Sequence, residues 1–207
     1  MACVFLFAAW IRHAEIKHGR IAMAGFVGFM AAANYENIGA PMRDSMFPTI
    51  GSGLSAPEVW DAIPFLAKLQ IIGAIGVFEH ISEDKNFLAA DGMSHYMRGG
   101  KPGYFPTFAA NVHPCPLNLW DPFGFTKNLT AEQKAKKLNV EVNNGRLAMI
   151  GIFSLISASK GLQVPALNVI SLKQYGGEYM APFTAADVSL PFVNDMMGFV
   201  GNLGYQL

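Results

Sequence analysis

The sequence predicts an all-α membrane protein with three transmembrane helices, of which the first and third cross as a pseudo-two-fold pair, and a short amphipathic helix near the C-terminus. Three observations support this fold class. The 207 residues are 52% hydrophobic and only 14% charged, whereas a soluble domain carries about 25% charged residues. One motif occurs twice, and basic residues alternate between the predicted loops. The length suits one domain, 1–207.

The repeated motif reads Glu15-Ile-Lys-His-Gly-Arg-Ile-Ala-Met23 in its first copy and Glu141-Val-Asn-Asn-Gly-Arg-Leu-Ala-Met149 in its second. Glu, Gly, Arg, Ala and Met recur at the same spacing, whereas His18 stands where Asn144 stands. Charged groups inside an apolar segment are costly and usually functional. A duplicated set of such groups therefore indicates a site.

The first predicted helix covers residues 10–33, and the sequence is almost wholly apolar after Arg20. A bilayer-spanning helix needs about 20 residues, so this segment spans only if Glu15, His18 and Arg20 enter the membrane region with it. Residues 34–57 are rich in Gly, Pro and Ser and predict a loop.

The second predicted helix covers residues 57–83 and begins with the capping sequence Ser55-Ala-Pro-Glu58. A long irregular connection is expected from 84 to 126. The third helix, 130–160, opens with the capping box Thr130-Ala-Glu-Gln133. An interfacial amphipathic helix is expected at 190–203.

Positive charge predicts the orientation of these spans. Arg12 and Lys17 fall before the apolar part of the first span, and Lys85, Arg98, Lys101, Lys127, Lys134, Lys136 and Lys137 fall between the second span and the apolar part of the third. The first loop carries only Arg43 and the tail after Gly161 only Lys173. The N-terminus and the second loop are therefore expected on the same, positive side of the membrane.

The spacing within the motif predicts contacts between the two copies. Residues three apart share a helix face, so Glu15 points with His18 and Glu141 with Asn144. Each arginine lies about 140° around the helix from its own glutamate. If the two helices cross, Arg146 reaches Glu15 and Arg20 reaches Glu141 reciprocally. The small residues Gly19, Ala22, Gly145 and Ala148 would allow the close approach.

The polar face of the motif also predicts magnesium ligands. After pairing with an arginine, each glutamate is expected to keep a spare oxygen, and magnesium favours oxygen. The glutamate oxygens, the His18 imidazole and the Asn144 carbonyl are all suitable axial ligands for the Mg²⁺ of a tetrapyrrole. One protein ligand per pigment is enough, because the macrocycle fills four positions of the metal.

The paired motifs resemble the first and third helices of the light-harvesting chlorophyll-binding family. Gln70-x8-Glu79 is similar to the second helix of that family in its chlorophyll a/c antennae, and Trp120-Asp-Pro-Phe-Gly-Phe125 resembles its carotenoid-binding loop. The resemblance implies chlorophyll a, chlorophyll c and carotenoids of the peridinin, diadinoxanthin or fucoxanthin type. The implied chlorophyll-binding residues are Glu15, His18, Gln70, Glu79, Glu141 and Asn144, with magnesium held by Glu15, His18, Glu141 and Asn144. The implied carotenoid-binding loop comprises Asp121, Pro122, Gly124 and Phe125.

The resemblance further implies a multi-pass protein of the plastid thylakoid membrane that passes excitation energy to a photosystem core. Its partners would be that core, neighbouring antenna subunits and thylakoid lipids. The segment Tyr96–Tyr104 favours photosystem I. The sequence departs from the family at Ala158, where a Gln is common, and residues 1–10 do not resemble the loop that usually precedes the first helix.

Three other functions remain open. A photoprotective quencher of the same family would use acidic residues such as Glu36 and Asp44. Glu-x-x-His is also a di-iron enzyme motif, but Asn144 breaks its second copy. A transporter would need more spans, and a net charge of zero gives no indication of nucleic-acid binding. We therefore expect a protein without enzymatic activity.

The sequence predicts His13, His95 and His113 as solvated loop or cap residues and His80 as an interfacial one.

Overall fold

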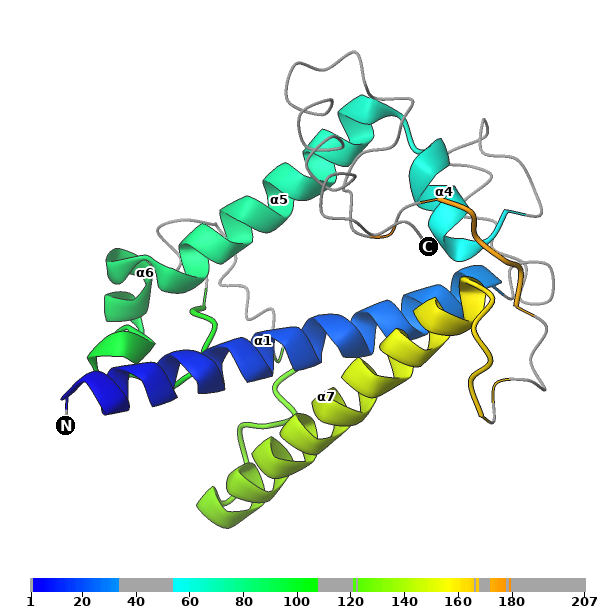
Figure 1. Cartoon of the computed structure of the whole chain (residues 1–207). Coiled ribbons are helices and arrows are strands. Elements are labelled where there is room, and N and C mark those ends of the chain that lie inside the picture. Colours follow the sequence, from blue (N-terminus) through cyan, green and yellow to red (C-terminus); the bar gives the residue numbers. More distant parts are fainter. Residues whose placement is uncertain are drawn as a thin grey trace. The chain divides into compact units, whose positions relative to one another are not determined.

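A computed structural model describes residues 2–33, 54–107, 121, 123–165, 167, 172–177 and 179. These residues form α-helices and one 3-10 helix, with no strand among them (Figure 1). The chain divides into two compact units, one made of residues 1–26 and 70–151 and the other of residues 27–69 and 152–207. The predicted helix at 190–203 and the side chains of His113 and Pro122 lie outside the described residues.

Helix α1 spans Ala2–Ala33. The prediction that the first helix begins near Trp10 is therefore wrong. Residues 2–9 are apolar and contain neither glycine nor proline, so nothing in them ends a helix that continues from Trp10. The basic and acidic residues of the motif consequently lie in the middle of a helix of 32 residues.

The second predicted helix is divided in two. Helix α4 spans Ala56–Ala62, and helix α5 spans Phe65–Glu83. Pro64 explains the division, because proline lacks an amide hydrogen and drives the preceding residue out of helical geometry. Ile63 is indeed extended, with φ −66° and ψ 133°. At the start of α4, the Ser55 amide donates to the Glu58 carboxylate at 2.7 Å, as in a capping box.

The connection expected to be irregular from 84 to 126 contains two short helices. Helix α6 spans Lys85–Ala90, and η1 spans Tyr96–Arg98. Asp84 caps α6 by accepting from two backbone amides, and His95 Nδ1 caps η1 by accepting from the Met97 amide at 3.2 Å. Both helices are too short to show an apolar period, so their caps were the only sequence signal.

Helix α7 spans Ala131–Ser159, within one residue of the predicted range at each end. The Thr130 side chain accepts from the Gln133 amide at 3.3 Å, and Gln133 accepts from the Thr130 amide at 3.1 Å. This reciprocal pair satisfies two of the amides that every helix start leaves unpaired.

Helices α1 and α7 meet at two glycines of the repeated motif. A Cβ on Gly19 would lie 3.0 Å from the Gly145 Cα, and one on Gly145 would lie 2.9 Å from the Gly19 Cα. The two backbones therefore touch, which any larger side chain would prevent. Within the unit of residues 1–26 and 70–151, this contact sets the two copies of the motif against each other.

Among the described helices, one is both long and apolar enough to cross a membrane by length and composition, namely Phe65–Glu83. Its surface is apolar and exposed along most of its length, with Leu66, Ile75 and Val77 more than half exposed. Such a surface is typical of a helix that faces lipid or pigment rather than water.

Candidate functional site

The two copies of the motif are joined by two reciprocal ion pairs. Arg20 Nε donates to Glu141 Oε1 at 2.6 Å, and Arg146 Nε donates to Glu15 Oε1 at 2.6 Å. Each glutamate therefore bonds to the arginine of the other helix, not to the arginine five residues along its own. The pairs lie beside the Gly19–Gly145 contact, so ion pairing and close packing both stabilise the crossing of α1 and α7.

The two ion pairs differ in the second oxygen of the glutamate. Arg12 Nη1 donates to Glu15 Oε2 at 2.8 Å, so both oxygens of Glu15 have partners and the expected spare oxygen is absent there. Among the described residues, no donor is bonded to Glu141 Oε2. The sequence explains the difference, because the residue three positions before Glu141 is Leu138 rather than an arginine. The Arg12 side chain is 53% exposed, and such surface pairs are weak.

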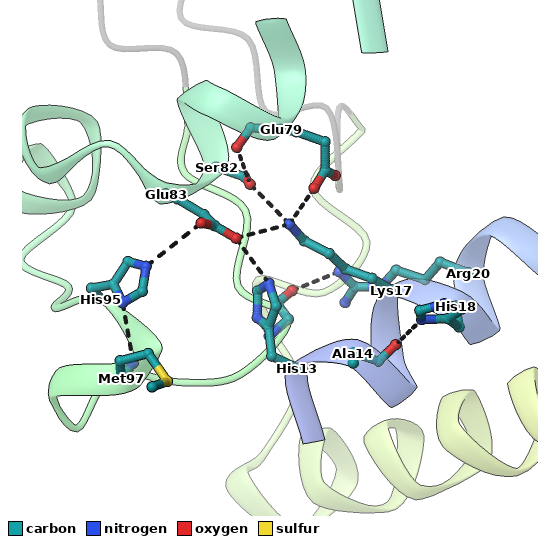
Figure 2. Close-up of polar contacts among 11 residues, drawn as sticks. His13, Ala14, Lys17, His18, Arg20, Glu79, Ser82, Glu83, His95 and Met97 are labelled. Atoms are coloured by element: carbon teal, nitrogen blue, oxygen red, sulfur yellow. Dashed lines mark hydrogen bonds and ion pairs between the residues drawn. The ribbon is translucent and has the colours of Figure 1, made fainter. Parts of the chain in front are cut away.

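The hydrogen bond of His18 favours the tautomer whose Nε2 can bind a metal. Its side chain is exposed, and its Nδ1 lies 2.8 Å from the carbonyl oxygen of Ala14 (Figure 2). A carbonyl only accepts, so Nδ1 carries the hydrogen and Nε2 of the neutral ring keeps its lone pair. Metal-binding histidines commonly use this arrangement, in which the second nitrogen fixes the ring. Asn144, its counterpart on α7, is also exposed. Both side chains are open to an axial ligand role.

The predicted site residues of α5 differ in their surroundings. Gln70 is exposed. Glu79 Oε2 accepts from Lys17 Nζ at 2.6 Å, and the same ammonium lies 3.3 Å from both Ser82 Oγ and Glu83 Oε1 (Figure 2). Lys17 was missed as a site residue because the sequence presents it as one more basic residue before a span. Its place two residues after Glu15, inside the motif, was the available signal.

A cavity of about 710 Å³ lies beside the Arg20–Glu141 pair. Its apolar lining comes from Ile16, Pro102, Leu138 and Val142, and its charged lining from Arg12, Arg20, Lys101, Glu141 and Arg146. Ligand pockets of several hundred cubic ångströms commonly combine such apolar walls with a few polar groups. Glu141, whose second oxygen has no donor among the described residues, is thus at the edge of a space large enough for an organic cofactor.

One wall of this cavity is fixed to α1 through Gly103. The Gly103 amide donates to His13 Nδ1 at 3.0 Å, and its carbonyl accepts from Arg20 Nη1 at 2.6 Å. Gly103 has φ 75°, and a Cβ there would lie 2.6 Å from Ile16 Cγ2, so only glycine fits. The prediction that His13 is solvated is wrong. Its ring is 5% exposed and stacks on Tyr96 with centroids 3.9 Å apart.

The other end of this segment is held by Asp91. Its carboxylate accepts from the Tyr104 hydroxyl at 2.9 Å and from the Thr107 amide at 2.7 Å. Burial, together with the bond to Asp91, raises the pKa of Tyr104 to about 12. Tyr104 therefore stays a neutral donor at every physiological pH, and the wall of the cavity does not change with pH through this residue.

The predicted carotenoid-binding loop is organised by Asp121. Its carboxylate accepts from the amides of Phe125 at 2.8 Å and Thr126 at 2.7 Å. Hydrogen bonds from the Thr126 side chain and backbone lower the pKa of Asp121. Gly124 has φ 73°, which allows the tight turn. Phe123 and Phe125 are 81% and 78% exposed, so two aromatic rings project from the loop.

The described residues contain no group of three or more His, Cys, Asp or Glu side chains placed to hold a metal ion. A di-iron site needs a cluster of that kind. In its place, Glu15 and Glu141 are each bonded to an arginine. The polar groups of the motif therefore suit single ligands to separate metals, each of which would bring its other ligands with it.

Comparison with known proteins identifies the family. The profile of the family named chlorophyll A-B binding protein matches residues 6–160, which include both copies of the motif, all of α5 and the Asp121 loop. The chain belongs to this family. The chlorophyll A-B binding proteins bind pigments and are not a family of enzymes, which agrees with the single-ligand geometry of the site.

Several similar curated proteins are named fucoxanthin-chlorophyll a-c binding proteins. The chain is 30% identical over 148 residues to a fucoxanthin-chlorophyll a-c binding protein of Trieres chinensis, covering 70% of this chain and 63% of that protein. It is 32% identical to fucoxanthin-chlorophyll a-c binding protein E of Macrocystis pyrifera, covering 70% and 58% of the two chains. Protein B of Phaeodactylum tricornutum is 29% identical, covering 70% and 62%. The matched part of the chain thus spans less than two thirds of each relative.

Proposed function

We propose that the protein is a photosynthetic antenna subunit that binds chlorophyll a, chlorophyll c and carotenoids of the fucoxanthin type and passes excitation energy to a photosystem. The names of the relatives, which are chloroplastic fucoxanthin-chlorophyll a-c binding proteins, support the choice of pigments. The observation that carries the proposal is the doubled motif, in which two cross-helix ion pairs stand beside the outward-facing His18 and Asn144.

In this function the protein holds pigments and performs no bond chemistry. His18 offers Nε2 and Asn144 its carbonyl oxygen, while Glu141 offers Oε2. Glu15 would hold a metal through Oε2 only if that oxygen gave up its hydrogen bond from Arg12. Bound chlorophyll supplies the light absorption, and the chain supplies fixed positions, since the ligands stand on helices whose crossing is set by glycine contact and ion pairs.

The cavity beside Glu141 is the proposed position for one of these pigments. A flat, largely apolar pigment matches its lining of Ile16, Leu138 and Val142, and Glu141 at its edge provides the metal ligand. Gly103 fixes the wall formed by residues 101–104, so this pigment would contact the second loop as well as α1 and α7.

The Asp121 loop is proposed to hold one end of a carotenoid. Three hydrogen bonds to the Asp121 carboxylate fix the backbone of the turn, and the exposed rings of Phe123 and Phe125 offer an apolar surface for a polyene. In solution these two rings would be unfavourably exposed, which a bound carotenoid would relieve.

The proposed location is the thylakoid membrane, with α1, α5 and α7 as three spans. Helix α5 is apolar enough to span by composition. Helices α1 and α7 carry charged groups, of which Arg20 and Glu141, and Arg146 and Glu15, pair across the two helices, and pairing is what makes charge tolerable within a membrane. The alternation of basic residues along the chain supports the same three-span arrangement.

Refolding with pigments tests the function. The purified chain, refolded in detergent with chlorophyll a, chlorophyll c and fucoxanthin, should show stable red chlorophyll absorption, and excitation of the carotenoid should produce chlorophyll fluorescence. Free pigments in the same detergent are the control. Absorption without carotenoid-sensitised emission would contradict energy transfer, and the absence of bound chlorophyll would contradict the whole proposal.

Photosystem I is the proposed partner, as the sequence of Tyr96–Tyr104 favours. Solubilised thylakoids separated on a density gradient would show the protein migrating with photosystem I particles rather than photosystem II particles. Migration with photosystem II, or only with free antenna, would contradict this choice of partner while leaving the antenna function intact.

The ligand assignment has a separate test in Asn144→Leu. This variant should fold and bind one chlorophyll fewer per polypeptide, because leucine offers no lone pair and the Asn144 side chain is exposed, so its loss leaves no buried gap. Asn86→Leu, at an exposed asparagine of α6 that is not a proposed ligand, is the control and should keep the full count. Equal pigment counts in Asn144→Leu and wild type would exclude Asn144 as a ligand.

A further inference from the structure

Lys17 on α1 and Glu79 on α5 form a third ion pair between helices, with Nζ and Oε2 2.6 Å apart (Figure 2). The Lys17 side chain is only 20% exposed, whereas the Glu79 side chain is 53% exposed. Among the described residues, Lys17 is the one hydrogen-bond and ion-pair partner of the Glu79 side chain. One carboxylate oxygen of Glu79 is therefore bonded to Lys17, while more than half of the side chain is exposed.

This pair completes a pattern among the six chlorophyll-binding residues that the family resemblance implies. The three carboxylates each bond to a cation from another helix: Glu15 to Arg146, Glu141 to Arg20 and Glu79 to Lys17. The three neutral side chains, His18, Gln70 and Asn144, form no ion pair with any described residue. A cross-helix cation thus accompanies each of the three charged ligands.

Charge balance gives the physical reason. The macrocycle of a chlorophyll already balances the charge of its magnesium, so a carboxylate ligand adds a net negative charge. In surroundings of low dielectric constant, an unpaired charge is very costly, whereas a bonded pair is tolerated. A neutral imidazole or amide creates no such cost. A cation is therefore required at each carboxylate ligand and only there.

We propose that Lys17 is the positioning residue for a chlorophyll ligated by Glu79: it cancels the charge of that carboxylate and aims its free oxygen away from α1. This inference rests on the proposed antenna function. It also assigns α1 a second set of contacts, because Lys17 ties it to α5 while Arg20 ties it to α7. The same ammonium lies 3.3 Å from Glu83 Oε1, so a purely structural tie is the competing interpretation.

Four variants separate the two interpretations after refolding with chlorophyll and carotenoid, with chlorophylls counted per polypeptide. Lys17→Met should lose one chlorophyll, and Lys17→Arg should keep the full count because it restores the cation. Glu79→Gln should keep the chlorophyll, since a neutral amide oxygen can ligate without a counter-charge. The double variant Lys17→Met/Glu79→Gln should therefore regain the pigment that Lys17→Met loses.

The melting temperature, measured by circular dichroism at 222 nm, provides a readout apart from pigment binding, and it should fall in Lys17→Met and recover in the double variant. Lys173→Met is the matched control. It breaks another lysine–glutamate pair, with Glu58 at 2.7 Å, at which no ligand is proposed, and should keep every chlorophyll.

Provided that the wild-type protein binds chlorophyll in the same experiment, either of two results would overturn the inference. One is a full pigment count in Lys17→Met. The other is a double variant as deficient as Lys17→Met, because then the role of Lys17 is structural and does not depend on the charge of Glu79. This second comparison holds even if Lys17→Met assembles no pigment at all. A wild type without chlorophyll would instead contradict the proposed function.

Discussion

At the scale of single residues, identical residues at equivalent positions of the two motif copies have different surroundings. Arg20 divides its guanidinium between Glu141 and the Gly103 carbonyl, whereas Arg146 directs both Nε and Nη2 to Glu15 Oε1. Glu15 also accepts a hydrogen bond from Arg12, and Glu141 has no corresponding second bond among the described residues. The repeat is therefore symmetric in its two ion pairs and asymmetric in the second glutamate oxygen, which is bonded in Glu15 and has no donor among the described residues in Glu141.

Of the three arginines that contact these glutamates, Arg20 and Arg12 should differ strongly in the stability lost when each is removed. Arg20→Leu leaves the largely buried Glu141 carboxylate unpaired and releases Gly103, and breaking such a pair costs about 3–5 kcal/mol. Arg12→Leu removes a contact of a half-exposed side chain and should cost less than about 1 kcal/mol. Thermal unfolding of the refolded proteins, followed by circular dichroism, should show Arg20→Leu unfolded or strongly destabilised and Arg12→Leu close to wild type. Similar losses in both variants would contradict the reciprocal pairs as the main stabilising contacts.

At the scale of elements, the crossing of α1 and α7 depends on glycine as much as on charge. Ion pairs between the motif copies can form only if the two backbones come close, and the Gly19–Gly145 contact brings them close. The crossing, the cavity wall and the ligand positions are then consequences of the same close approach.

Gly145→Ala should therefore destabilise the protein. Its added Cβ would lie 2.9 Å from the Gly19 Cα, and overpacking of this kind costs about 1–3 kcal/mol. Gly25→Ala in α1 is the matched control, because a Cβ there meets nothing within 4 Å. It should be neutral or stabilising by up to about 1 kcal/mol, since alanine favours the helix. Melting temperatures of both variants provide the measurement. An unaffected Gly145→Ala would show that the backbones are not in contact.

A second element, α4, is tied at its first turn to the chain after α7. Glu58 accepts from Lys173 Nζ at 2.7 Å, and this bond, with that of the Ser55 amide, lowers the pKa of Glu58. A carboxylate whose pKa is lowered on folding contributes stability above its unfolded pKa, and that stability is lost as pH falls through the folded value. The tie should therefore survive mild acidification, so an acid-sensing role for Glu58, as a quencher would need, is not favoured.

The pH dependence of Glu58→Gln tests this directly. The difference in melting temperature between wild type and Glu58→Gln should be constant from about pH 8 to pH 5.5 and shrink only below about pH 4.5, the ordinary range of a glutamate. A difference that already disappears between pH 7 and pH 5.5 would mean that the folded pKa is raised instead.

At the scale of the whole molecule, the sequence predicts contacts better than boundaries. Because a helix has a fixed period, the spacing of Glu15, Arg20, Glu141 and Arg146 implied both reciprocal pairs. The sequence does not mark Pro64 clearly as the end of a helix, because the apolar run continues on both sides of it. His13 and Lys17 could not be assigned from the sequence, since their partners, Gly103 and Glu79, are far along the chain and only tertiary structure brings them together.

The three-span arrangement makes a prediction for the whole chain that its own two cysteines can test. Three spans put the start of the chain and the second loop on one side of the membrane, so Cys3 and Cys115 should react with an impermeant thiol reagent from the same side of sealed vesicles. In a variant without these cysteines, Ser45→Cys in the first loop should react only from the other side, that is, after the vesicles are opened. Single variants Cys3→Ala and Cys115→Ala assign each signal. Labelling of all three positions from one side would contradict three spans, because a chain that leaves the membrane between the first and second helices must expose Ser45 on the face opposite to Cys3.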